Sequence, residues 1–337
     1  MRLVLGGYTS ADGGGMGMVT LEGGRFGVPV VVAEASNPSF LVVSSDGRFV
    51  YAVLEGDEGA VGAWLVGDDD GPWQALGEQS TGGSAPCHLT LSPDGRFVVV
   101  ANYGSGSVSV HPLLDDGSVA ARTDLVVHTG PVGPVADRQD GPHAHQVVFA
   151  PSGHLFSCDL GLDVVIAYDL DAQTGRLLEM GRSALAPGTG PRHLAFALDG
   201  SRAWVVGELS STVTVCRVDG WSLTPVSTVS SRAASAVGEN QPAEILVSAG
   251  GQELFVSNRG DDTVATFEVE GVSLRLSATV DCGGHWPRFI AFGEDEATVL
   301  VTNERSGSVT ALQRVLDRWS VTDSSDWRQP TVVADLA

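Results

Sequence analysis

A proline-led segment recurs six times along this chain at nearly constant spacing. Each copy continues with a short β-branched or aromatic run, turns at a Gly or polar pair and resumes with a more apolar run; the prolines are Pro38, Pro86, Pro142, Pro191, Pro242 and Pro287. The gaps between successive prolines are 48, 56, 49, 51 and 45 residues. One four-stranded propeller blade takes about 40–50 residues. The repeat therefore predicts a β-propeller.

The strand signals inside each copy agree with this prediction. Turns such as Asp46-Gly47 and Asp94-Gly95 separate the first run from the second, as in β-hairpins. The second run is almost continuously apolar, as in residues 97–100, which is typical of a strand buried on both faces. A third run alternates between apolar and polar residues. No long amphipathic helix is predicted.

The two ends of the chain supply a seventh blade. Residues 329–336 resemble a first strand, with Pro330 standing 43 residues beyond Pro287, and residues 3–9 and 17–21 resemble second and third strands. Pairing of the N- and C-terminal strands would close the ring and remove its free edges. The sequence thus predicts an all-β, single-domain fold over residues 1–337, a seven-bladed β-propeller of four-stranded antiparallel blades.

Composition limits the possible partners and the compartment. The chain has 41 acidic and 19 basic residues, giving a formal net charge of −22, which argues against nucleic acid or an anionic membrane as a partner. No apolar run approaches a membrane span, and the first residues lack a signal-peptide pattern, so we expect a cytoplasmic protein, a monomer or a weak homo-oligomer. Four cysteines without CxxC spacing are expected to be buried thiols: Cys87, Cys158, Cys216 and Cys282.

Two columns of the repeat break its apolar pattern. The first lies on the first strands, which line the central channel of a propeller, and contains Ser39, Cys87, His145, Arg192, Ala243 and Arg288. The second lies at the ends of the second strands and contains Glu55, Tyr103, Asp159, Glu208, Arg259 and Glu304, with Asn102, Asn258 and Asn303 beside it. Equivalent positions in a propeller lie at one height, so a polar ring is expected at one end of the channel. Such a ring can simply solvate the channel mouth, but converging arginines, a histidine and a glutamate favour a site for an anionic substrate.

Several motifs resemble those of the seven-bladed propeller lactonase family. They are GPHAHQVVF at 141–149 with its approach DRQDGPHAH at 137–145, GPRHLAF at 190–196, GELSSTV at 207–213, SNRGDDTVATF at 257–267 and PDGRFVVVANYGSGSVSV at 93–110. The family includes the propeller type of 6-phosphogluconolactonase and the 3-carboxy-cis,cis-muconate lactonizing enzyme. The resemblance extends over essentially the whole chain, and GPHAH followed one blade later by GPRH is its most specific part.

The resemblance implies a metal-independent site that needs no cofactor. The family's catalytic histidine, glutamate and two arginines fall on His145, Glu208, Arg192 and Arg259. Gly207 stands where the family usually has Asn, so an amide beside Glu208 is missing. Further residues are expected to line the substrate, namely Tyr103, Asp159, Asn258, Asn303, Arg288 and His193.

These residue types suit the hydrolysis of a small anionic sugar lactone. A histidine can act as general base near neutral pH, and arginines can hold an anionic group or a developing oxyanion. Glu208 could orient His145 or carry a proton to the leaving ring oxygen. The same residues could also close a muconate, so the residue types alone do not choose between the two directions. The family resemblance implies the reaction of a 6-phosphogluconolactonase; a carboxymuconate cycloisomerase and a non-catalytic binding module remain as alternatives.

Three other sequence features argue against a zinc site, a phosphate-binding loop and a serine hydrolase. His143 and His145 form an HxH pair without a third nearby ligand, so zinc is not expected. The glycine-rich residues 13–17 open no helix and are interpreted as a hairpin turn and not a phosphate-binding loop. The chain contains no GxSxG motif, which argues against a serine hydrolase of the α/β type.

Overall fold

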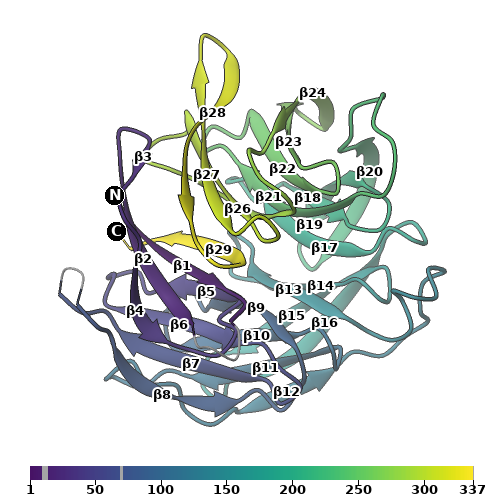
Figure 1. Cartoon of the computed structure of the whole chain (residues 1–337). Coiled ribbons are helices and arrows are strands. Elements are labelled where there is room, and N and C mark those ends of the chain that lie inside the picture. Colours follow the sequence, from purple (N-terminus) through teal and green to yellow (C-terminus); the bar gives the residue numbers. More distant parts are fainter. Residues whose placement is uncertain (10–13, 69–70, 337) are drawn as a thin grey trace.

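Seven β-sheets are arranged around a central axis in the computed structural model, which describes residues 1–9, 14–68 and 71–336 (Figure 1). Six of the sheets have four antiparallel strands, and the seventh adds a short fifth strand. The described residues contain no helix. The predicted seven-bladed β-propeller is confirmed.

The first six blades follow one another along the chain, and each runs from its inner to its outer strand. The first three blades comprise β5 (Phe40–Val43), β6 (Phe49–Leu54), β7 (Ala60–Leu65) and β8 (Gln74–Ser80); β9 (Pro86–Leu91), β10 (Phe97–Asn102), β11 (Ser107–Pro112) and β12 (Asp124–Val127); and β13 (Ala144–Phe149), β14 (Leu155–Asp159), β15 (Val164–Asp171) and β16 (Arg176–Ala184). The next three comprise β17 (Pro191–Phe196), β18 (Arg202–Gly207), β19 (Thr212–Asp219) and β20 (Ser222–Ser230); β21 (Gln241–Val247), β22 (Glu253–Arg259), β23 (Thr263–Glu270) and β24 (Ser273–Asp281); and β25 (Pro287–Phe292), β26 (Thr298–Asn303), β27 (Ser308–Val315) and β28 (Arg318–Asp326).

The seventh blade joins the two ends of the chain. Its inner strand is the C-terminal β29 (Pro330–Asp335), which pairs with β1 (Arg2–Gly7); β2 (Gly15–Glu22) follows and pairs with both β3 (Arg25–Phe26) and β4 (Val30–Glu34). Leu3 lies opposite Asp335 and Gly6 lies opposite Val332 in an antiparallel ladder. The two termini consequently lie side by side (Figure 1). The predicted closure is confirmed.

The hydrophobic core lies between neighbouring blades, where the second and third strands pack face to face. All six residues of β10 are buried, as its apolar run predicts. One core cluster joins Phe156 of the third blade to Val205 of the fourth. Apolar area buried in this way is the main stabilising contribution to such a ring. All four cysteines are free and buried, as expected.

A β-bulge follows the proline in six of the seven inner strands. The ladder shifts register there, and the residues that fall at the shift are Cys87, His145, Arg192 with His193, Ala243 with Glu244, Arg288 and Thr331. A bulge breaks the strict alternation of a strand and redirects side chains. In the fourth and fifth blades two successive side chains fall at the bulge, so both can reach the channel.

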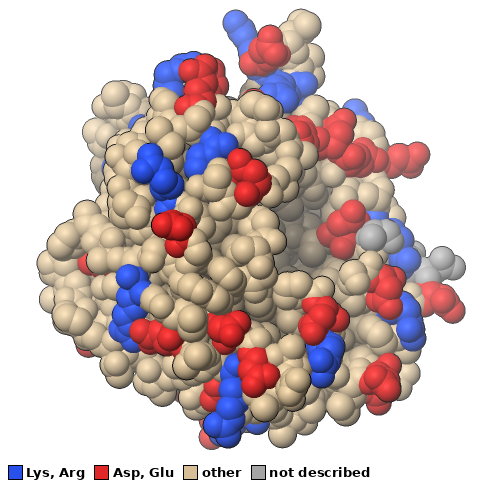
Figure 2. Space-filling view, turned by 180° about the vertical axis from the view of Figure 1, so that it is seen from behind, with Lys and Arg blue, Asp and Glu red and all other residues tan. Residues whose placement is uncertain are grey.

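Charged side chains of both signs are mixed over the face shown in Figure 2. Acidic groups are spread around its periphery with arginines between them, and a central hollow is bordered mainly by uncharged residues. In the described part of the chain, no helix is long and apolar enough to span a membrane.

Candidate active site

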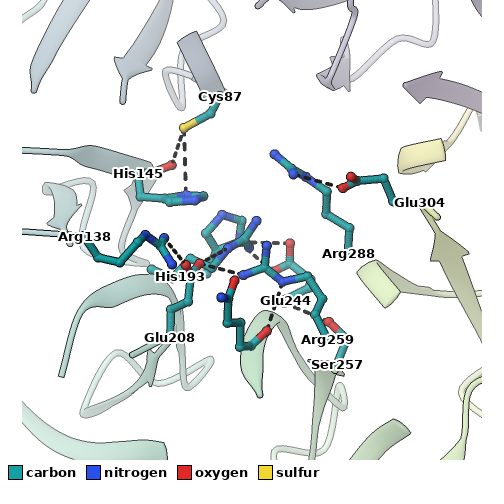
Figure 3. A network of polar contacts seen from close by, with 12 residues as sticks. Cys87, Arg138, His145, His193, Glu208, Glu244, Ser257, Arg259, Arg288 and Glu304 are labelled. Atoms are coloured by element: carbon teal, nitrogen blue, oxygen red, sulfur yellow. Dashed lines mark hydrogen bonds and ion pairs between the residues drawn. The ribbon is translucent and has the colours of Figure 1, made fainter. Parts of the chain in front are cut away.

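Glu208 is the centre of a buried ionic cluster at one end of the channel (Figure 3). It directly follows β18, and its carboxylate accepts a hydrogen bond from Arg138 at 2.5 Å and from Arg259 at 2.6 Å, while Nε of Arg192 lies 3.1 Å away. Only 2% of the Glu208 surface is exposed. Burial alone would raise its pKa, but Arg259, Arg192 and Arg138 outweigh burial and lower the pKa to about 2.

The contacts of Glu208 differ from those that its predicted role requires. Its carboxylate contacts three arginines and no hydrogen bond joins it to His145. With a pKa of about 2 the carboxyl group stays ionised at neutral pH and holds no proton to donate. In this arrangement Glu208 holds the three arginines, and its predicted role in orienting His145 or carrying a proton to the leaving group stays a prediction.

Arg259 and Arg192 differ in how many of their guanidinium N–H groups have a hydrogen-bond partner. Arg259 donates through Nε to the carbonyl oxygen of Gln241 at 2.9 Å and is thereby fixed to its own blade. Arg192 is 3% exposed, and its Nη1 has no hydrogen-bond partner in the described part of the chain. Burial and the neighbouring Arg259 lower the pKa of Arg192 to about 10, which leaves it charged at neutral pH. A buried, charged donor without a partner is suited to an anionic ligand.

His145 lies beside this cluster, at the bulge of β13. Its ring centroid is 5.2 Å from that of His193 and 5.5 Å from that of Tyr103. Burial and the charge of Arg192 lower the pKa of His145 well below its usual value. The imidazole is consequently neutral at pH 7, with a lone pair available to accept a proton.

Cys87 and Tyr103 support the His145 ring from two sides. The Cys87 thiol lies 3.8 Å from Nδ1 of His145 and donates to the carbonyl oxygen of His145 at 3.3 Å. Burial raises the pKa of Cys87 to about 12, so the sulfur remains a thiol. The Tyr103 ring stacks on His143 at 4.4 Å and meets His145 edge-on. Tyr103 thus lies beside His145, as the sequence predicted.

Arg288 and Glu304 face His145 across the channel (Figure 3). Nη1 of Arg288 donates to Glu304 at 3.0 Å, and the guanidinium lies 5.2 Å above the Tyr8 ring. The Tyr8 hydroxyl lies 3.1 Å from both carboxylate oxygens of Glu55. Tyr8 belongs to the seventh blade and occupies the position equivalent to Tyr103, so continuing the second column into the N-terminal strand would have found it.

His193, the neighbour of Arg192 in the sequence, is paired with Glu244. Nδ1 of His193 lies 3.0 and 3.1 Å from the two oxygens of Glu244, and the amide of Ile245 donates to the same carboxylate at 2.9 Å. Burial raises the pKa of Glu244 to about 7. The rings of Phe40 and His88 pack against His193 and against each other.

Glu244 and Arg138 were not predicted from the sequence. Glu244 adjoins Ala243 in the first column, and strict alternation assigns only one of two neighbours to the channel. The bulge in β21 takes in both residues and breaks this alternation. Arg138 lies in the connection before β13, inside the motif DRQDGPHAH, where a loop residue has no repeat equivalent. Only its position inside this motif could have indicated that Arg138 belongs to the site.

Three predicted lining residues have structural roles instead. Asp159 pairs with His128 at 2.7 Å and accepts from the amides of His143 and Leu162. Asn258 donates to the carbonyl of Ser231 at 2.8 Å, and Asn303 donates to Thr310 at 3.1 Å. All three side chains are fully buried and tie second strands to neighbouring loops or strands. In the fifth and sixth blades the next residue along the chain, Arg259 or Glu304, takes part in the ionic contacts around the channel.

Gly207 has no room for the side chain that the family usually carries there. A Cβ at this position would lie 2.4 Å from Oγ of Ser210 and 3.0 Å from the carbonyl oxygen of Thr189. Ser210 and Thr189 therefore occupy the space in which an asparagine side chain would begin. Glu208 is held by arginines, and its orientation does not depend on an amide at position 207.

The two histidines of the HxH pair do not converge. Nδ1 of His143 contacts the carbonyl oxygen of Tyr103 at 3.0 Å and Nε2 contacts Asp140 at 2.9 Å, away from His145. The described residues contain no group of three or more His, Cys, Asp or Glu side chains placed to hold a metal ion.

Comparisons with known proteins agree with the fold and the motifs. A family model described as "Lactonase, 7-bladed beta-propeller" matches residues 2–331. The 6-phosphogluconolactonase of Bacillus subtilis is 32% identical over 85% of this chain and 82% of its own. The periplasmic gluconolactonase PpgL of Pseudomonas aeruginosa has 31% identity and a TM-score of 0.92 over 99% of this chain and 98% of its own. A protein of Lactobacillus plantarum has 30% identity and a TM-score of 0.92 over 98% of both chains.

Proposed function

The chain belongs to the seven-bladed β-propeller lactonase family, and we propose that it is a lactone hydrolase acting on 6-phosphogluconolactone at the ring of side chains around Glu208. The observation that carries the proposal is the buried Arg192, whose Nη1 has no partner in the described structure. The charge of this arginine acts on the neighbouring His145, which is a neutral base. An electrophile-binding cation next to a neutral base is what ester hydrolysis requires. Relatives named as lactonases favour hydrolysis over muconate cyclisation.

The proposed reaction has two steps. His145 takes a proton from a water molecule as the water oxygen bonds to the lactone carbonyl carbon, and the negative charge that forms on the carbonyl oxygen is stabilised by Arg192 and Arg259. The bond from this carbon to the ring oxygen then breaks, and the ring oxygen leaves with the electron pair and takes the proton from His145. The product is the open-chain hydroxy acid, and the imidazole returns to its neutral state.

The charge of the protein makes the arginines necessary for binding. A net charge of −22 repels a sugar phosphate at long range, but this repulsion is screened beyond a Debye length of about 8–10 Å. Short-range bidentate contacts from Arg192, Arg259 or Arg288 then dominate. The affinity for the anionic substrate should therefore depend on these side chains and not on the overall field.

The compartment is a further part of the proposal. Four free, buried thiols fit a reducing environment such as the cytoplasm, and we propose that location. The Pseudomonas neighbour is named as periplasmic, so fractionation of the native cell is the direct test.

The test of the activity is a rate comparison under pH-stat conditions. Purified protein is assayed on 6-phosphogluconolactone and on gluconolactone with the spontaneous rate subtracted. His145→Ala should lower kcat by about 10²–10⁴-fold, the usual contribution of a general base. His154→Ala is the matched control, because His154 stacks on Trp221 in a turn of the third blade and lies away from the site. Absence of hydrolysis above the spontaneous rate would reject the activity, and an unchanged rate in His145→Ala would reject the base.

A further inference from the structure

A buried carboxylate–histidine pair, Glu244 and His193, lies next to the proposed catalytic ring. Both oxygens of Glu244 lie within 3.1 Å of Nδ1 of His193, and both side chains are buried, with 6% and 2% of their surface exposed. In Figure 3 the His193 ring lies between His145 and Glu244. A carboxylate that holds Nδ1–H of a histidine leaves Nε2 free to accept a proton, as in the catalytic triads of hydrolases.

Three polar atoms around this pair have no partner in the described part of the chain. They are Nε2 of His193, Nδ1 of His88 and Nη1 of Arg192, and all of them are buried. The rings of His88 and His145 lie 5.1 and 5.2 Å from that of His193. Buried polar atoms are rarely left unsatisfied, and an ordered water or a ligand usually fills the gap. The His145 and His193 rings are close enough for a water bound at Nε2 of His193 to bridge them.

The carboxylates of the site differ in what they are paired with. Glu208 is paired with three arginines and Glu304 with Arg288, while Glu55 accepts from Tyr8. Glu244 is the one of these four whose side-chain partner is a histidine. It is therefore the carboxylate best placed to take up a proton.

His145 needs such a group. When it takes a proton from water it becomes a cation close to Arg192, Arg259 and Arg288, whose charges all disfavour its protonation. No carboxylate is hydrogen-bonded to the His145 ring in the described structure. A proton moved from His145 onto Glu244 would replace an unfavourable cation by a neutral acid.

We propose that His193 and Glu244 form a proton relay behind His145, an inference that rests on the proposed lactonase activity. The proton taken by His145 passes through a bridging water to Nε2 of His193, while the Nδ1 proton of His193 moves to Glu244. The reverse transfer returns the proton through His145 to the ring oxygen as the carbon–oxygen bond breaks. The relay itself makes and breaks only bonds to protons, the carbon–oxygen bonds change as in the two-step reaction above, and no further reactant is needed.

The relay requires Glu244 to be ionised before each turnover. If Glu244 is already protonated, its hydroxyl donates to Nδ1, and the His193 proton then sits on Nε2, which cannot accept another. Burial raises the pKa of Glu244 to about 7, and Arg192 and the amide of Ile245 oppose this shift. The other titratable or charged groups around the pair are His88, His145, Arg259, Arg288 and Glu208. Turnover should therefore rise with pH through an ionisation near pH 7.

The test is the pH dependence of kcat and KM between about pH 5.5 and 8.5 for the wild type and Glu244→Gln. Glutamine keeps the size and an acceptor for Nδ1–H but cannot take a proton. We expect kcat to fall by about 10- to 100-fold, the ionisation near pH 7 to disappear, and KM to change by less than about threefold because the substrate-binding arginines remain. His193→Gln should give the same profile as Glu244→Gln.

Asp159→Asn is the matched control, since it alters the other fully buried carboxylate–histidine pair, that of Asp159 and His128. It should lower stability and leave the ionisation in kcat in place. If Glu244→Gln does not fold, Glu244→Asp is used instead and should shift this ionisation. An active wild type whose profile is unchanged in Glu244→Gln, or unshifted in Glu244→Asp, overturns the relay while the lactonase activity stands. An inactive wild type overturns the proposed function itself.

Discussion

The buried ionic cluster around Glu208 gives a stability prediction whose size follows from the structure. Three arginines lower the pKa of Glu208 from 4.5 to about 2. Each pKa unit corresponds to 1.36 kcal/mol, so the folded protein favours the ionised over the neutral form by about 3 kcal/mol more than the unfolded chain does. Glu208→Gln replaces the carboxylate by a neutral group of the same shape and leaves buried arginine charges uncompensated. We expect the free energy of unfolding at pH 7 to fall by about 3 kcal/mol, within the usual range for breaking a buried pair.

Urea denaturation of the wild type and Glu208→Gln at several pH values measures this loss. A carboxyl group whose pKa is lowered by folding stabilises the protein above its unfolded pKa and loses that contribution as the pH falls. The difference between the two proteins should thus be constant from about pH 5 to pH 8 and shrink as the pH falls from about 4.5 towards 2.

Glu253→Gln is the control, because its single partner Arg314 lies at 2.6 Å and both side chains are about one third exposed. Its cost should stay below about 1 kcal/mol. An equal cost for the two variants, or a Glu208→Gln difference that does not depend on acid pH, would refute the reasoning.

Three further predictions concern binding, closure of the ring and metal dependence. Arg259→Lys should lower kcat/KM for 6-phosphogluconolactone by about tenfold or more, because lysine keeps the charge but lacks the planar fork that contacts Gln241 and Glu208 together; an unchanged value in steady-state kinetics would count against a role in the site. Deleting residues 327–337 removes β29 and exposes the edges of β1 and the neighbouring blades, so thermal unfolding and size-exclusion chromatography should show a strongly lowered Tm or aggregation; a monomer with the wild-type Tm would contradict the closure. Incubation with EDTA should leave the lactonase rate unchanged, and a loss that added metal restores would show that a cation takes part.

The architecture could be predicted from the sequence because its signals are local and repeated. The period of the prolines, the turn glycines and the apolar second strands each depend on a few adjacent residues, and seven copies reinforce one another. The same repeat placed His145, Arg192, Glu208 and Arg259 at one end of the channel, since equivalent strand positions of a ring share one height. The structure brings these four together.

The partners of these residues were decided by the tertiary structure. Glu208 was expected to serve His145, yet Arg138 reaches it from a loop 70 residues away in the chain and completes an arginine cluster. Glu244 was missed because a bulge adds one residue to the strand and so breaks the two-residue period on which strand predictions depend. The repeat determines how far along the propeller axis a residue lies. The direction of its side chain depends on bulges in the inner strands, and its partner can come from a loop of another blade.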